Sequence, residues 1–191
     1  MTLQAALTQL VAHLREHGHE LSALSTIVAE DAPGDRPAFV DRLQDGIETS
    51  RGFAAEALAA AEAALDAAAY PPELGRSKRE LTAAHRALAR LGRSLASDVA
   101  SSRHMDELRR LSAERGEGWA AWAGVVRETI QRCVQQLHGI NDDLVTANEE
   151  IIDPELVSVA VSVRMPPRTA DQSVLTTERI RAETERSEEQ P

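Results

Sequence analysis

Three histidines and two glutamates lie within eight residues near the start of the chain, in the stretch HLREHGHE at 13–20. His13, Glu16 and His17 have the H-x-x-E-H spacing with which one class of zinc peptidases arranges its metal ligands and its catalytic base. Glu16 and His19 have the E-x-x-H spacing that binds iron inside four-helix bundles. The stretch therefore raises two hypotheses of metal catalysis, and each requires further ligands elsewhere in the chain.

The further ligands that these two hypotheses require are missing from the sequence. A peptidase of the first kind needs a glutamate roughly seventy to eighty residues later as its third ligand. No glutamate stands between Glu80 and Glu107, and this gap covers the expected window. A di-iron site needs a second E-x-x-H motif, but Thr82, Ser101 and Gln135 are the residues three before the later histidines. We therefore predict no metal site and no cofactor.

A nucleophilic cysteine is the next candidate, and Cys133 is the only cysteine in the chain. His138 follows it by five residues, which on a helix turns the two side chains about 140° apart. They are not expected to face each other, and a cysteine on an inward helix position usually acts as a small hydrophobe. Gly116 and Gly118 lack the flanking strand and lysine of a phosphate-binding loop. We predict no catalytic residue, no enzyme activity and no small-molecule substrate.

The composition predicts an all-α protein. The chain has 191 residues, of which 42% are hydrophobic and only 3% aromatic, and alanine supplies much of the apolar content. The net charge of −10 and the absence of a basic stripe with interleaved aromatics argue against nucleic-acid binding. The N-terminus has no basic region before its apolar residues, and no uncharged apolar run approaches membrane-spanning length. We expect a cytoplasmic protein without a membrane segment.

Four long stretches carry apolar residues at alternating spacings of three and four, as helices that pack on one another do. We expect helices from the N-terminus to the loop at 30–37, from Pro37 to Ala69, from Ser77 to Ala113 and from Trp119 to Ile152. The third pattern weakens at Ser101, Ser102 and Arg103, which leaves room for a kink or for two shorter helices. The expected inward positions are Leu3, Leu7, Leu10, Leu14, His17, Leu21, Leu24 and Val28; Phe39, Leu43, Ile47, Ala54, Leu58, Ala61 and Leu65; Leu81, Ala84, Leu88, Leu91, Leu95, Val99, Leu108 and Leu111; and Trp119, Trp122, Val126, Ile130, Cys133, Leu137, Ile140 and Leu144.

These helices predict an elongated antiparallel four-helix bundle with coiled-coil-like packing, which forms a domain at 1–153. Within it His17 falls on an inward position, where a neutral histidine can hydrogen-bond to Glu20 or to another helix. Such a buried polar layer fixes the register of helices at some cost in stability. His13 and His19 are then expected to flank the core or to lie in solvent. The stretch at 13–20 is accordingly interpreted as one polar layer rather than as an active site.

The period of the sequence changes after the fourth helix. The segment LVSVAVSVR at 156–164 places alternate residues on opposite faces, which predicts a β-strand within 154–165. The remaining residues, 166–191, are polar and charged and are expected to be disordered or loosely helical. One strand in a helical protein must pair with another copy, with a partner's sheet edge, or lie against the bundle. The valines expected on one face are Val157, Val159, Val161 and Val163.

Two tryptophans at the start of the fourth helix allow two interpretations. Trp119 and Trp122 lie three residues apart and would share one helix face, so they can anchor the core at the end of the bundle. They can also form a hot spot that binds a protein partner. Our predicted partner-binding residues are these two tryptophans together with the four valines.

The fourth helix and the strand, GWAAWAGVVRETIQRCVQQLHGINDDL followed by VSVAVSVR, resemble small proteins encoded beside caspase- and TPR-repeat-associated (CATRA) proteins in bacterial conflict systems. The similarity covers roughly 118–164 and rests on the two tryptophans, the mid-helix cysteine and the valine–serine strand. The resemblance implies a non-enzymatic helical accessory protein that works with a caspase-like protease partner in defence.

The expected function is that of an adaptor that binds a protein partner through its bundle and its C-terminal strand. One alternative is a structural protein that assembles into dimers or filaments through its long helices. A second alternative is a metal-binding bundle enzyme, for which the chain lacks a complete ligand set.

Overall fold

The structure, a computed structural model, describes residues 2–69 and 72–151. Within these ranges the chain is all-α and contains no strand. The elements are α1 (Leu3–Glu30), α2 (Ala38–Ala67), α3 (Leu74–Ser94), the π-helical turn η1 (Leu95–Val99), α4 (Ser102–Glu114) and α5 (Glu117–Ile151). The four expected helices are confirmed, and the third is divided into α3, η1 and α4.

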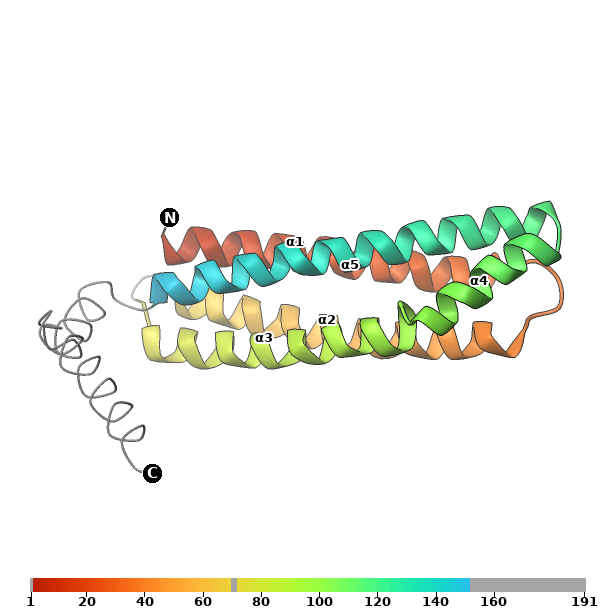
Figure 1. The fold of residues 1–191 in the computed structure, drawn as a ribbon. Helices are drawn as coiled ribbons and strands as arrows, with labels where there is room; N and C mark the ends of the chain where they lie inside the picture. The colour runs from red at the N-terminus through yellow and green to blue at the C-terminus, as the bar shows by residue number, and fades with distance from the viewer. Residues whose placement is uncertain (1, 70–71, 152–191) are drawn as a thin grey trace, which may run out of the picture. The chain divides into compact units, whose positions relative to one another are not determined.

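Four helical rods pack side by side with antiparallel neighbours (Figure 1). Helix α1 packs against both α2 and α5, and α2 packs against α3. The third rod follows α3 through η1 into α4, which leaves the line of α3 at an angle toward the beginning of α5 (Figure 1). Short connections between successive helices produce this alternation of direction.

Local chemistry sets the ends of several helices. The hydroxyl of Thr2 accepts a hydrogen bond from the Ala5 backbone N–H at 3.3 Å, and the Ser101 hydroxyl accepts one from His104 N–H at 3.3 Å. Both are N-caps, which satisfy donors that a helix leaves unpaired at its first turn. Gly34 and Gly116 have φ of 60° and 84°, a conformation that favours glycine, in the loops before α2 and α5.

The core lies along the predicted apolar stripes. Every inward position predicted for α3, η1, α4 and α5 is buried. In α2 the prediction is partly wrong, because Leu58 and Leu65 are only half-buried. Ala57 and Ala64 take the buried positions beside them. Alanine on this face lets α2 and α3 approach closely, which a leucine at the same position would prevent.

The break in the third rod is a π-helical turn and lies earlier than the weak region of the sequence. The Ala100 N–H donates to the Leu95 carbonyl at 2.6 Å, a bond between residues five apart. This turn packs closely on α2, where a Cβ added to Gly46 would lie 2.7 Å from the Asp98 carbonyl oxygen. Gly46 is therefore the residue that lets α2 and η1 touch.

Two further predictions concern membranes and the strand. No helix among the described residues is long and apolar enough to cross a bilayer. The segment at 156–164, with Val157, Val159, Val161 and Val163, lies outside the described residues, as does the expected tail at 166–191.

Candidate functional site

The three histidines of the stretch at 13–20 point to three different places. His13 lies at the edge of the contact between α1 and α5, and its Nδ1 bonds the Asp143 carboxylate. His17 is fully buried in the core, and His19 is exposed beside α2. Glu16 is exposed on the outer face of α1. Helical geometry therefore separates the ligands that the H-x-x-E-H spacing brings together in sequence.

The contact between α1 and α5, which we call the α1–α5 seam, is closed by polar side chains. Asp143 is 9% exposed, and it accepts hydrogen bonds from Gln9 Nε2 at 2.8 Å and from His13. His13 flanks the core as predicted, since its side chain is 44% exposed, and this carboxylate reaches it from the opposite helix. Farther along the seam Arg132 and Glu20 approach to 3.5 Å. The seam thus pairs charges and hydrogen-bonding groups across two antiparallel helices.

His17 forms the predicted polar layer, and its partner is on another helix rather than Glu20. Its Nδ1 lies 3.2 Å from Gln136 Oε1 on α5, and since that oxygen only accepts, Nδ1 carries the proton. The other ring nitrogen, Nε2, is buried and has no hydrogen-bond partner among the described residues. Burial lowers the pKa of His17 below its ordinary value, although Gln136 and Glu20 oppose the shift. The imidazole is therefore neutral at pH 7.

Among the described residues no group of three or more His, Cys, Asp or Glu side chains is placed to hold a metal ion. His17 and Asp143 have their polar contacts within the seam, at separate levels along α5. The chemistry of this stretch is therefore hydrogen bonding between helices.

Cys133 is buried on the inward face of α5. Burial, with the nearby Glu20 carboxylate as the next cause, raises the pKa of its thiol to about 12. A thiol in this state is not a nucleophile at neutral pH. His138 is exposed on the same helix, and its Nδ1 lies 2.8 Å from the Val134 carbonyl, so it does not serve as a base for Cys133.

The two tryptophans are anchors of the core. Trp119 and Trp122 are 7% and 5% exposed, and their rings meet edge to face at a centroid distance of 5.4 Å. Trp122 Nε1 donates to the Ile27 carbonyl at 3.0 Å, and the Arg115 guanidinium lies 5.6 Å from the centre of the Trp119 ring. The hydrogen bond of Trp122 joins α5 to the end of α1. The partner-binding role of the two tryptophans stays a prediction.

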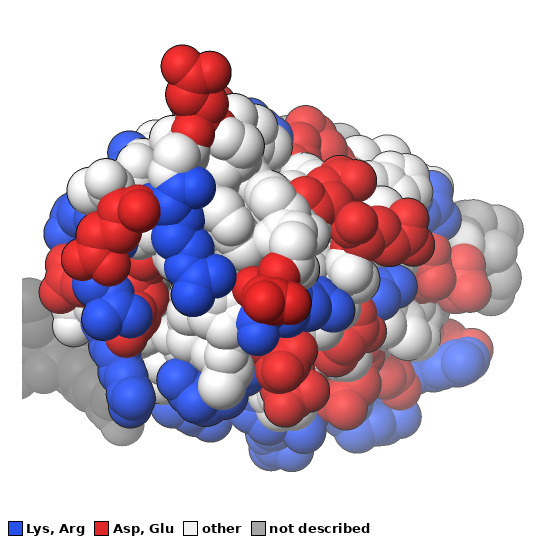
Figure 2. All heavy atoms as spheres, turned by 90° about the vertical axis from the view of Figure 1, so that its right-hand side faces the viewer, with Lys and Arg blue, Asp and Glu red and all other residues white. Residues whose placement is uncertain are grey.

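Charges of both signs surround the bundle end that carries the loops between α1 and α2 and between α4 and α5. Figure 2 faces this end and shows acidic and basic side chains interspersed with uncharged ones. Mixed charges of this kind keep a surface solvated and create no field of one sign. The strongest charge asymmetry of the described residues lies instead on α3, which carries six basic residues and one acidic residue.

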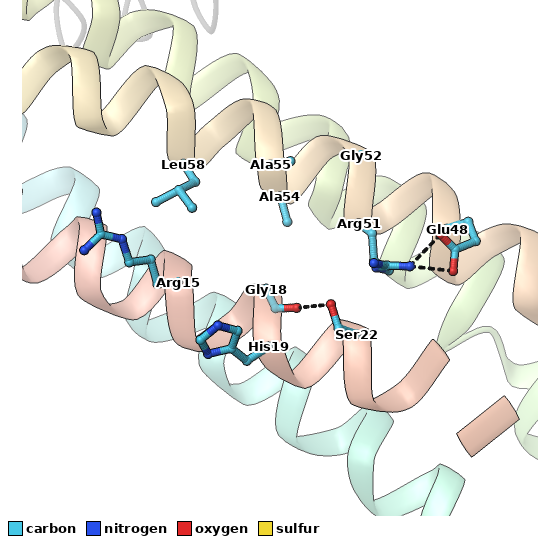
Figure 3. A pocket seen from close by; sticks show the side chains of 10 residues that line it. All are labelled: Arg15, Gly18, His19, Ser22, Glu48, Arg51, Gly52, Ala54, Ala55 and Leu58. Atoms are coloured by element: carbon cyan, nitrogen blue, oxygen red, sulfur yellow. Dashed lines mark hydrogen bonds and ion pairs between the residues drawn. The ribbon is translucent and has the colours of Figure 1, made fainter. Parts of the chain in front are cut away.

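A groove of 530 Å³ lies between α1 and α2 (Figure 3). A Cβ added to Gly18 or to Gly52 would meet no atom within 4 Å, so the two glycines help to open it. Its arginines are already paired, Arg51 with Glu48 at 2.8 Å and Arg15 with Glu62 at 2.6 Å. Its lining consists of Arg15, Gly18, His19, Ser22, Glu48, Arg51, Gly52, Ala54, Ala55 and Leu58.

A second groove lies between the third rod and α5. It holds 340 Å³ and is lined by Gly92, Leu95, Ala96, Ala100, Val134, Leu137, His138 and Asn141. Helix α3 approaches α5 at fewer positions than it approaches α2, so the contact between α3 and α5 is the looser of the two. The sequence patterns identify Leu95 and Leu137 as inward residues but give no sign that the two helices stay apart there.

Comparisons of the chain with protein-family models, with curated proteins and with solved structures found no match.

Proposed function

We propose that the protein is a non-enzymatic adaptor that binds a protein partner by adding its valine segment, 156–164, as a strand to the partner's sheet. The observation that supports this is the contrast between that segment and the bundle before it. Val157, Val159, Val161 and Val163 alternate with small or polar residues, whereas every described element is helical. Helices satisfy their backbone groups internally, so the described helices offer no sheet edge to a strand.

The bundle supplies a rigid base for this segment in the proposal. Helix α5 runs without a break from Glu117 to Ile151, and the seam with α1 fixes its register. The valine segment begins five residues after that helix ends. The resemblance noted in the sequence would make the partner a caspase-like protease of a bacterial defence system.

Two matched double variants test the strand. Val159→Asp with Val161→Asp places charges on the valine face, and Ser158→Asp with Ser162→Asp places the same charges on the opposite face. We expect the valine variant to lose proteins that the wild type and the serine variant retain in affinity purifications from the source cells. Thermal unfolding should be the same in all three proteins. Equal retention by all three would contradict the proposal.

Self-assembly is the second candidate, and the exposed apolar side chains on the bundle favour it. Leu74, Val125 and Val145 are 52%, 47% and 55% exposed. Light scattering over a concentration series measures the mass of the particle in solution. A dimer that the valine variant converts to a monomer would mean that the strand pairs two copies. A dimer that survives that variant would point to the helices.

A further inference from the structure

The outer face of α3 carries a row of arginines, whose positive charge is opposite in sign to the net charge of the chain. Arg79, Arg86 and Arg93 are spaced seven residues apart, which places them on one helix face over a length of about 21 Å. All three are exposed. The whole chain has a net charge of −10, whereas α3 has six basic residues and one acidic residue. We call these three residues the arginine row.

The arginine row has no ion-pair partner among the described residues. Of the α3 arginines, Arg76 pairs with Glu73 at 3.9 Å, and Arg90 pairs with Glu56 and lies over the Phe53 ring. None of the three row residues forms an ion pair with another described residue. Three like charges on one face repel one another, and an acidic ligand would relieve this repulsion.

An apolar groove lies next to the arginine row. This is the 340 Å³ groove between the third rod and α5, and Gly92, the neighbour of Arg93, forms part of its wall. A Cβ on Gly92 would lie 3.6 Å from Leu137 Cδ2, which fixes the level at which α3 and α5 face each other. Leu95, Ala96 and Val134 supply further apolar lining.

The face of α5 that lines the groove extends to an exposed valine. Val134, His138, Asn141 and Val145 follow spacings of four, three and four, so they share one face of α5. Three of them line the groove, and Val145 is 55% exposed. Because the helices are antiparallel, Val145 lies opposite the part of α3 about two turns before Gly92. This face of α5 and the arginine row of α3 therefore extend over the same length of the bundle.

We propose that the groove between α3 and α5 binds an acidic amphipathic segment of a protein partner, whose apolar side chains enter the groove while its carboxylates meet the arginine row. The charge complementarity selects an acidic ligand, and the apolar lining of the adjoining groove selects a peptide over a nucleic acid or a simple anion. The inference rests on the proposed role as a binding module, but it uses the bundle rather than the valine segment.

Fluorescence anisotropy with the full chain tests this surface, and the probe is a labelled synthetic helix of glutamates with leucines at i and i+4. We expect binding that weakens as salt rises, because exposed charges are screened. Arg86→Glu with Arg93→Glu should weaken it about tenfold or more. The matched control is Arg42→Glu with Arg103→Glu, two exposed arginines elsewhere without an ion pair among the described residues, and it should change binding by less than about twofold.

A second pair of matched variants tests the apolar part of the proposed surface. Val145→Asp should weaken binding, and Val125→Asp, an exposed valine on another face of α5, should not. Equal binding by the groove variants and the wild type would overturn the proposal. So would equal binding of a probe with serine in place of leucine, or tighter binding of an RNA oligonucleotide.

One further variant distinguishes binding at the valine segment from binding at the groove. Val159→Asp with Val161→Asp should leave the binding of the probe unchanged. A loss of binding would place the probe on the valine segment and would overturn the groove proposal while supporting the strand. If the strand tests fail while the probe still binds the groove, the strand proposal is overturned and the groove proposal is supported.

Discussion

Helix α5 has two neighbours and is held to them in different ways. On the α1 side, Asp143, Gln136 and Arg132 meet partners at three levels, and Trp122 bonds the end of α1. On the α3 side, Val134, Leu137 and Asn141 line an open apolar groove. The first contact fixes position by directional bonds, whereas the second leaves surface uncovered. A helix that is anchored firmly along one side can leave its other side available for a ligand.

The largest effect is expected where the third rod touches α2. Gly46→Ala would put a methyl group 2.7 Å from the Asp98 carbonyl oxygen and force η1 away from α2. We expect a loss of about 2–3 kcal/mol in the free energy of unfolding, and a melting temperature lower by about 5–10 °C. Because η1 lines the groove, this variant also tests whether the open side depends on that contact.

A second glycine on the same helix is the control for this variant. Gly52→Ala adds a methyl group to open space and improves helix propensity, so it should stabilise the protein by up to about 1 kcal/mol. Urea unfolding followed by circular dichroism measures both variants. If Gly46→Ala were as stable as Gly52→Ala, the close approach of α2 and η1 would be wrong.

The two sides of α5 can be compared directly with one alanine on each. Asp143→Ala removes a buried carboxylate and leaves Gln9 and His13 without their partner, so it should cost about 1–2 kcal/mol. Asn141→Ala changes an exposed residue of the groove and should alter stability by less than about 0.5 kcal/mol. Equal effects in thermal unfolding would remove the distinction between the seam and the groove.

The polar layer at His17 should lower stability, because one of its buried ring nitrogens has no partner among the described residues. His17→Leu replaces the ring by an apolar side chain of similar size and should raise the free energy of unfolding by about 1 kcal/mol. Calorimetry with and without EDTA should give the same melting temperature for the wild type. A fall with EDTA would mean that His17 binds a metal ion after all.

The smallest effect is a pH dependence of the same layer. Burial lowers the pKa of His17 in the folded protein, so the unfolded chain binds more protons as the pH falls below about 6.5. The neutral, buried state of His17 therefore contributes fully to the free energy of unfolding above that pH, and this contribution is lost on acidification. Burial lowers the pKa of His104 as well, which adds in the same direction.

Melting temperatures measured between pH 8 and pH 5 should therefore fall toward the acidic end, and His17→Leu should flatten the curve. The range stops above the region in which Glu48 contributes, since its hydrogen bond from Ser25 lowers a carboxyl pKa from 4.5. An unchanged slope in His17→Leu would assign the pH dependence to other groups.

Much of the bundle could be predicted because the same apolar residues indicate both the helical period and the buried face. The stripe from Leu7 to Val28 and that from Trp119 to Leu144 specify both the helices and their inward faces. The bond between His13 and Asp143 could not be predicted in this way, since it joins residues 130 positions apart and depends on how far α1 slides along α5. The arginine row did have a signal, because Arg79, Arg86 and Arg93 repeat at seven residues within one predicted helix.

The break in the third rod shows a second limit of prediction from the sequence pattern. The pattern weakens at Ser101–Arg103, and Ser101 does cap the new helix. The π turn lies before it, in residues whose inward positions still fit the stripe, because Leu95 and Val99 are both buried. A bond between residues five apart leaves the spacing of apolar residues almost unchanged, so the sequence pattern shows the cap and hides the turn.

The π turn gives the third rod one residue more than a continuous α-helix would need. Removing a single residue between Ser94 and Ala100 would replace the bond between residues five apart by the ordinary α-helical spacing and would leave the residues downstream in their present phase, because the π turn already takes up the extra residue. Leu108, Leu111 and His104 would then stay buried. Relatives with a gap of one at this point should therefore keep the apolar positions of α4 aligned with those of this chain, so that a change in length is inherited without a change of phase.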